Sequence, residues 1–170
     1  MALRTILKKD TDEESLRKKS RPVTVFDDRL HRMIDDMVET LLDSGGVGLA
    51  APQVGILRRI VVIQREDESI LELVNPVIVE TAGEQTGLEG CLSVPGVWGE
   101  VVRPMTVTVK AQDRFGNEFR ETASELIGRC FVHECEHLDG ILFTDRAERL
   151  MTEEDLAREE EENADVEEEA

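Results

Sequence analysis

Hydrophobic positions between residues 27 and 46 recur with the spacing of an amphipathic helix. One face of this helix collects five large apolar side chains: Leu30, Met33, Ile34, Met37 and Leu41. Asp27 or Asp28 is a suitable N-cap, and the glycines that follow Ser44 are typical of a helix end. The pattern predicts a helix that runs to about Leu42 and buries its apolar face.

Further along the chain, β-branched residues and a period of two replace the helical pattern. Residues 58–64 and 71–79 are rich in Val and Ile and are predicted strands. Between residues 101 and 112, Thr and Lys alternate with Val and Ala, which predicts one half-buried strand. A turn at residues 115–117 leads into another strand over residues 118–123.

A second helix is predicted over residues 125–138, closed by Gly140, and it carries the pentad HECEH at residues 133–137. His133 and His137 project from the same helical face, so both imidazoles can reach one metal ion. Glu134 lies beside that face, where it can transfer protons without being a ligand. The chain has only 3 histidines and two lie in this pentad, which makes chance a poor explanation.

These elements indicate the α+β class. We expect mostly antiparallel sheets around a central metal-binding helix with the HExxH pentad, an N-terminal helix and a C-terminal helical, acidic tail. The chain of 170 residues is long enough for one domain with a buried core.

The C-terminal end holds most of an unusual negative charge. The net charge is −18, from 20 Lys and Arg against 38 Asp and Glu. Residues 151–170 contain 11 acids and one base, which gives −10 and leaves −8 for the other residues. We expect one domain over residues 1–150 and a solubilising tail over residues 151–170, helical from 153 to about 162. A partner-binding tail is the alternative.

Composition argues against secreted and membrane proteins. Three cysteines without paired spacing make no disulfide framework, which fits a reducing cytosol. The longest apolar runs, such as residues 60–63, are too short to cross a membrane. The first residues resemble neither a signal peptide nor a transit peptide. We therefore expect a cytoplasmic protein that does not bind membranes.

The pentad leaves a third metal ligand to be found, because a catalytic zinc-type site has three protein ligands and a position for water. No histidine follows His137, so the downstream candidates are Asp139, Asp145 and the later acids. Upstream, Cys91 follows a glycine and offers a thiolate, a strong ligand for zinc or iron. From the residues alone, a buried core thiol explains Cys91 equally well.

Three segments, in this order, resemble the motifs of the peptide deformylase family: GVGLAAPQ at 46–53, EGCLS at 89–93 and HECEH at 133–137. The resemblance extends over about residues 4–149. It implies a bacterial cytoplasmic enzyme, monomeric, that hydrolyses the N-formyl group from the N-terminal formylmethionine of newly made polypeptides and releases formate.

The resemblance also implies roles for site residues. Cys91, His133 and His137 would hold one divalent metal, ferrous iron in the cell, with zinc, nickel or cobalt able to substitute. Glu134 would act as the base that later protonates the leaving amine. The side-chain amide of Gln53 and the N–H of Leu92 would stabilise the oxyanion.

The implied substrate is the N-formylmethionyl end of a nascent peptide. Val47 and Gly48 would form a strand edge that pairs with the peptide backbone. Gly90 allows close approach of a bound group, and Cys130 matches a wall position of the methionine pocket. Cys135 faces away from the ligand side and is expected in the core.

Two positions depart from the family pattern. Val132 stands where the family commonly has Gln, which removes a polar group beside a ligand. Glu136 stands where Asp is common, and we expect it to pair with a basic residue, Arg103. We expect an active enzyme with altered metal affinity. The acidic tail opposes contact with RNA, so proximity to the ribosome would not involve it.

Two other classes of protein remain in view at this stage. One is a metallopeptidase or another metal amidase that uses Asp139 or a later acid as third ligand. The other is a non-enzymatic binding protein with a closed structural site, for instance one that adds Cys130 to Cys91 and the two histidines. Loss of metal in Cys91→Ser would separate the deformylase from the peptidase.

Overall fold

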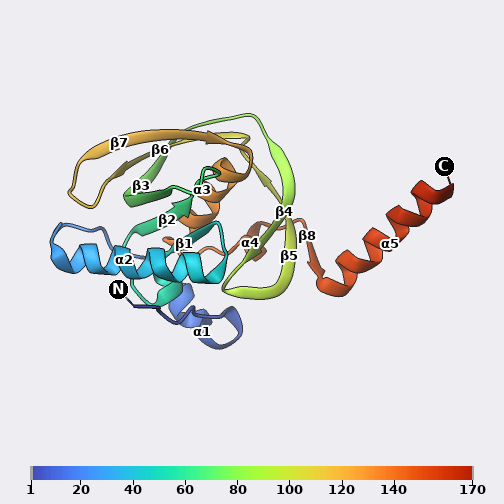
Figure 1. Cartoon of the computed structure of the whole chain (residues 1–170), viewed down its shortest axis with the longest axis horizontal. Helices are drawn as coiled ribbons and strands as arrows, with labels where there is room; N and C mark the ends of the chain where they lie inside the picture. Colours follow the sequence, from blue (N-terminus) through green and yellow to red (C-terminus); the bar gives the residue numbers. More distant parts are fainter. Residues whose placement is uncertain (1, 170) are drawn as a thin grey trace.

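The computed structural model describes residues 2–169 and has two antiparallel sheets (Figure 1). The five-stranded sheet has the order β1-β2-β3-β6-β7, and the three-stranded sheet has the order β4-β5-β8. The strands are β1 (Gly48–Ala50), β2 (Ile60–Gln64), β3 (Ile70–Ala82), β4 (Gln85–Cys91), β5 (Val94–Arg103), β6 (Thr106–Gln112), β7 (Glu118–Ser124) and β8 (Arg149–Thr152). Helices accompany both sheets, which confirms the α+β class.

The first predicted helix is confirmed as α2 (Asp28–Ser44). The Asp27 carboxylate caps it by accepting a hydrogen bond from the N–H of Leu30 at 3.0 Å. Gly45 ends it in the left-handed region, with a φ of 73°. The apolar side chains of α2 are buried as its sequence pattern predicts, apart from the half-buried Met33.

The second predicted helix is confirmed as α3 (Glu125–His137), and the chain leaves it through Gly140, whose N–H donates to the His137 carbonyl at 3.1 Å. Strand β2 lies between the two helices in the core. Ile60 and Val62 belong to the apolar cluster under α2, whereas the alternate residues Val61 and Ile63 belong to the cluster under α3. The large sheet is therefore covered on both faces, and α3 is held in the interior.

The prediction of one strand over residues 101–112 is wrong. The strand is interrupted at Pro104. As a result, β5 ends at Arg103 in the small sheet, and β6 begins at Thr106 in the large sheet. Proline has no N–H to give to a strand ladder, which makes it a natural point of exit. The strands at residues 58–64, 71–79 and 118–123 are confirmed within a few residues. The strand predicted over residues 71–79 is longer in the structure, where β3 continues to Ala82.

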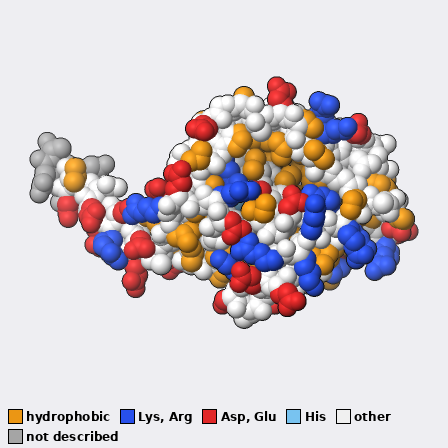
Figure 2. Space-filling model, turned by 180° about the vertical axis from the view of Figure 1, so that it is seen from behind, with side chains coloured by type: hydrophobic (Ala, Val, Ile, Leu, Met, Phe, Trp, Pro, Cys, Tyr) orange, Lys and Arg blue, Asp and Glu red, His pale blue; other side chains and the backbone are white. Residues whose placement is uncertain are grey.

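Several short elements were not predicted: α1 (Lys9–Leu16), the 3-10 helix η1 (Ala51–Val54), α4 (Phe143–Arg146) and the strands of the small sheet. The tail forms α5 (Glu153–Glu169), which is longer than expected and projects away from the body, with acidic side chains along it (Figure 2). Within residues 2–169, no helix is long and apolar enough to cross a membrane.

Candidate active site

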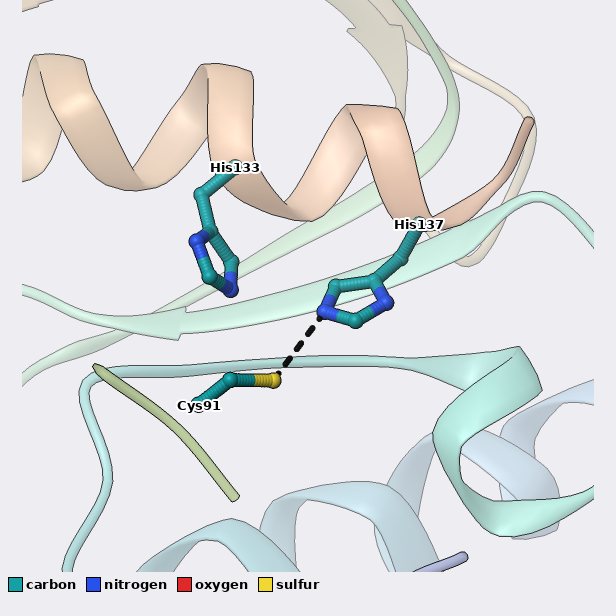
Figure 3. Close-up of side chains that lie close together, drawn as sticks. All are labelled: Cys91, His133 and His137. Atoms are coloured by element: carbon teal, nitrogen blue, oxygen red, sulfur yellow. Dashed lines mark hydrogen bonds between the residues drawn. The ribbon is translucent and has the colours of Figure 1, made fainter. Parts of the chain in front are cut away.

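Three potential metal-binding side chains converge beneath α3. His133 and His137 project from one face of this helix toward Cys91, at the end of β4 (Figure 3). One ligand atom from each residue lies within 4.8 Å of the other two, and Cys91 Sγ is 3.4 Å from His137 Nε2. Both histidines are buried, so the cluster lies in a region of low dielectric constant.

The spacing and chemistry of this cluster fit a divalent metal. In a tetrahedral site with ligands about 2.0–2.3 Å from the ion, neighbouring ligand atoms lie about 3.5 Å apart. The separation of 3.4 Å between Cys91 and His137 matches this value. Burial and the positive charges of His133 and Arg103 hold the pKa of His137 well below its ordinary value, which keeps a lone pair available. A thiolate with two imidazoles suits zinc or ferrous iron.

Glu89 fixes the orientation of His133. One carboxylate oxygen lies 2.8 Å from His133 Nδ1, and Arg103 and Arg129 donate hydrogen bonds to the same carboxylate at 2.7–2.9 Å. Burial raises the pKa of Glu89, but the hydrogen bonds from His133 and Arg103 outweigh it and lower the pKa to about 2. The ionised carboxylate accepts a hydrogen bond from Nδ1–H, so Nε2 is the nitrogen that is left to bind a metal. Burial lowers the pKa of His133, but the contacts with Cys91 and Glu89 outweigh it and raise the pKa to about 10. A metal would take the place of the Nε2 proton.

Glu134 lies next to the cluster and is almost completely buried, with 3% of its surface exposed. Its Oε1 is 3.5 Å from His133 Nε2, and its Oε2 has no hydrogen-bond partner among residues 2–169. Burial raises the pKa of this carboxyl group to about 7, although the charge of His133 opposes the shift. A group of this pKa can accept and return a proton near neutrality.

Gln53 is held in a fixed orientation inside η1. Its Oε1 accepts a hydrogen bond from the Ala50 N–H at 2.9 Å, and its Nε2 donates to Ser93 Oγ at 3.1 Å. The same Nε2 lies 3.5 Å from Cys91 Sγ. Leu92 follows Cys91 in the tight connection between β4 and β5. The two predicted oxyanion donors therefore belong to neighbouring segments beside the cluster.

A cavity of about 510 Å³ opens beside these groups. Its wall includes all four predicted substrate residues, Val47, Gly48, Gly90 and Cys130. It also includes other predicted site residues: Gln53, Cys91, Leu92, His133 and Glu134.

Glycine is required at position 48, because an added Cβ would lie 2.7 Å from Cys130 Sγ and 2.9 Å from Glu134 Cγ. Strand β1 can thus pass directly along the side chain of Glu134. It is the edge strand of the large sheet, so one side of β1 is left open toward the cavity.

The polypeptide deformylase family model matches residues 4–153 of the chain. The chain belongs to the peptide deformylase family. It is 54% identical over 156 residues to the peptide deformylase of Caldicellulosiruptor bescii, covering 92% of each chain. It is 48% identical over 145 residues to peptide deformylase 1 of Bacillus subtilis, covering 85% of this chain and 91% of that one.

Solved structures of peptide deformylases share the fold. The crystal structure from Legionella pneumophila has a TM-score of 0.81 and 46% identity, covering 85% of this chain and 86% of that chain. The structure from Synechococcus elongatus, a complex with actinonin, has a TM-score of 0.81 and 41% identity, covering 86% of this chain and 79% of that chain. The chain is therefore a hydrolase that acts on formyl-methionyl peptides and removes the N-formyl group from nascent peptides, and its family depends on a metal.

One departure from the deformylase pattern has a clear structural outcome. Glu136 forms an ion pair with the buried Arg103, as predicted, and its other oxygen accepts a hydrogen bond from Arg146 Nε at 2.8 Å. Val132 packs against the apolar cluster under α3. Among the described residues, the buried His137 Nδ1 finds no hydrogen-bond partner.

Cys130, Cys135 and Asp139 were other residues considered for the site. Burial raises the pKa of Cys130 well above its ordinary value and that of Cys135 to about 12, so both thiols stay neutral. Asp139, the alternative third ligand, is exposed and paired with Arg59 at 3.0 Å. Sequence reasoning missed the roles of Glu89 and Arg129. The only signal for Glu89 was its place within the EGCLS motif.

Proposed function

We propose that Cys91, His133 and His137 together bind one divalent metal, ferrous iron in the cell, with zinc, nickel or cobalt able to replace it. The convergence of their ligand atoms within 4.8 Å is the observation that carries this assignment. The hydrogen bond between Glu89 and His133 supports it, because metal-binding histidines usually donate their other ring N–H to a carboxylate or carbonyl. The helix with the HExxH pentad is then the metal-binding helix.

The other site residues have separate roles in hydrolysis. Held by Cys91, His133 and His137, the metal would supply hydroxide at neutral pH and polarise the formyl carbonyl. Glu134 takes the proton of the attacking water and delivers it to the leaving amine. The Gln53 amide and the Leu92 N–H donate hydrogen bonds to the formyl oxygen as it becomes negative. A C–O bond forms, the C–N bond breaks, and formate and a free amino terminus leave.

The N-formylmethionyl end of a nascent peptide binds in the cavity. Its backbone pairs with the open edge of β1 at Gly48 and with the preceding Val47, which gives tolerance for the sequence after methionine. The methionine side chain enters the apolar part of the cavity beside Cys130, and Gly90 lets the wall approach closely.

The boundary expected at residue 150 falls inside β8, which pairs with β5, so we place the end of the catalytic unit at Thr152. The acidic tail is then α5. The enzyme acts as a monomer in the bacterial cytoplasm. It meets nascent chains near the ribosome without RNA contacts through α5, because acids repel phosphate.

The assignment is tested by measuring formate release from a short formyl-methionyl peptide. The protein is purified without oxygen and loaded with ferrous iron or nickel. Glu134→Ala should keep its metal but lose at least about 10³-fold in kcat, by analogy with the removal of other essential proton-transfer groups. Cys91→Ser should lose the metal, whereas the matched control Cys135→Ser should retain it. Retention of metal by Cys91→Ser would refute the ligand set.

A further inference from the structure

A three-residue segment near the N-terminus joins the two parts of the proposed oxyanion site. The Leu7 N–H donates to the Gln53 carbonyl at 2.7 Å, and the Lys9 N–H donates to the Ser93 carbonyl at 2.8 Å. We call residues 7–9 the N-terminal strap. It therefore contacts η1 on one side and the connection between β4 and β5 on the other.

The central residue of the strap adds a side-chain contact. Lys8 Nζ donates a hydrogen bond to the Leu92 carbonyl at 3.0 Å, and Lys8 lines the same cavity as Gln53 and Leu92. The backbone of Lys8 is itself fixed, because its N–H donates to Asp12 Oδ2 at 2.9 Å. The ammonium group is thus held at the cavity wall by contacts on both its side chain and its backbone.

This placement has two consequences for the reaction. The Leu92 carbonyl and the proposed donor Leu92 N–H belong to one residue, so a bond to the carbonyl restricts rotation of the whole connection. Preorganised donors stabilise a developing charge best, because they need no reorganisation as the charge appears. A positive charge in the same wall also favours a negative formyl oxygen over a neutral one.

The geometry points to Lys8 as a positioning residue for deformylation. It holds Leu92 in place and supplies a positive charge beside the oxyanion site. This inference rests on the proposed function, because it takes Gln53 and the Leu92 N–H as the oxyanion donors. It predicts that loss of the ammonium group lowers kcat more than it raises KM, because the benefit develops as the oxyanion forms.

The test compares Lys8→Met, Lys8→Arg and Lys9→Met in metal-loaded enzyme. Lys9 is the matched control, because it is adjacent and half-buried but donates its side-chain hydrogen bond to Thr144 Oγ1 at 3.3 Å. Lys8→Met should lower kcat by about 10-fold with KM nearly unchanged, less than the loss on removing a direct oxyanion donor. Lys8→Arg should recover most of this activity, and Lys9→Met should match the wild type.

Amide hydrogen exchange of Leu92 gives a second readout that does not depend on turnover. Exchange should be faster in Lys8→Met than in the wild type or Lys9→Met, because the Leu92 connection is less restrained. Unchanged exchange, or equal kcat values for Lys8→Met and Lys9→Met, would overturn the role of Lys8. If Gln53→Ala loses activity while Lys8→Met does not, only the Lys8 inference fails. If the wild type releases no formate, the proposed function fails, and exchange still decides whether Lys8 holds Leu92.

Discussion

His133 Nδ1 lies 2.8 Å from Oε1 of Glu89, and this contact joins the candidate metal cluster to a buried pair of arginines. Glu89 is 5% exposed, and the Arg103 and Arg129 side chains that contact it are also buried. One carboxylate therefore orients His133 and forms ion pairs with two arginines between α3 and the small sheet.

Replacing this carboxylate should affect both metal binding and folding. In Glu89→Gln the shape is kept but the charge is lost, which leaves two buried arginines without their main anionic partner. We expect a loss of about 3–5 kcal/mol in stability, typical of a broken buried ion pair. Metal affinity should fall about 10- to 100-fold, as for other residues that orient ligands. Thermal unfolding and metal content after dialysis measure the two effects.

The matched control is Glu84→Gln, which removes an exposed carboxylate just before β4, the strand that contains Glu89. It should change stability by no more than about 0.5 kcal/mol. If Glu89→Gln behaved like this control in both measurements, Glu89 would have no role in holding His133.

A second prediction concerns the close approach of β1 to α3. In Gly48→Ala, the added methyl group would overlap Cys130 Sγ and Glu134 Cγ, so the Glu134 side chain must move. A displacement of about 1 Å in a catalytic group can cost about 100-fold in rate, and we expect a loss in kcat of this order. Formate release checks this, with circular dichroism to show that the variant is folded. Full activity in a folded variant would show that Glu134 tolerates displacement.

Much of the large sheet and both long helices follow from local patterns in the sequence. Helix α2 has a strong apolar face and clear caps, and β2 and β3 are rich in β-branched residues, so local preference and burial agree. The convergence of Cys91, His133 and His137 was also predictable, although Cys91 depended on a resemblance to a known family.

The small sheet was not predictable in the same way. Strand β4 contains two glycines, and β5 contains Pro95 and two further glycines, residues that are depleted in strands. These segments become strands because they pair with each other and with β8, which lies far along the chain. The role of Glu89 depends on the same long-range pairing, since Arg103 of β5 and His133 of α3 both contact this one carboxylate.

Glu136 allows a buried ion pair to be compared with an exposed one. It contacts Arg103, whose side chain is 4% exposed, and Arg146, whose side chain is 52% exposed. Glu136→Ala should cost about 2–3 kcal/mol in stability, because Arg103 loses one of its two carboxylates. Arg146→Ala should cost less than about 1 kcal/mol, as is usual for exposed pairs. Chemical denaturation measures the stability of both variants. Unchanged stability and metal content in Glu136→Ala would show that the Arg103–Glu136 pair does not stabilise the protein or its metal site.

The boundary between β8 and α5 separates a packed segment from an exposed one. Met151 in β8 is 2% exposed and pairs with Trp98 of β5, whereas α5 is joined to the body by an ion pair between the exposed side chains of Arg149 and Glu159. Removing residues 153–170 takes away 11 acids and one arginine, which changes the net charge from −18 to −8. The melting temperature should then change by only about 2 °C, because exposed ion pairs contribute about 0–1 kcal/mol.

Removing residues 149–170 is the matching deletion that also takes β8. It exposes the surface that Met151 covers, and it should cost about 2–5 kcal/mol, as for the loss of a buried methionine. Thermal unfolding and formate release of the two truncated proteins give the comparison. Equal stability of both would place β8 outside the folded unit. A lower kcat after loss of residues 153–170 alone would show that α5 contributes to turnover, because the candidate site would otherwise be intact.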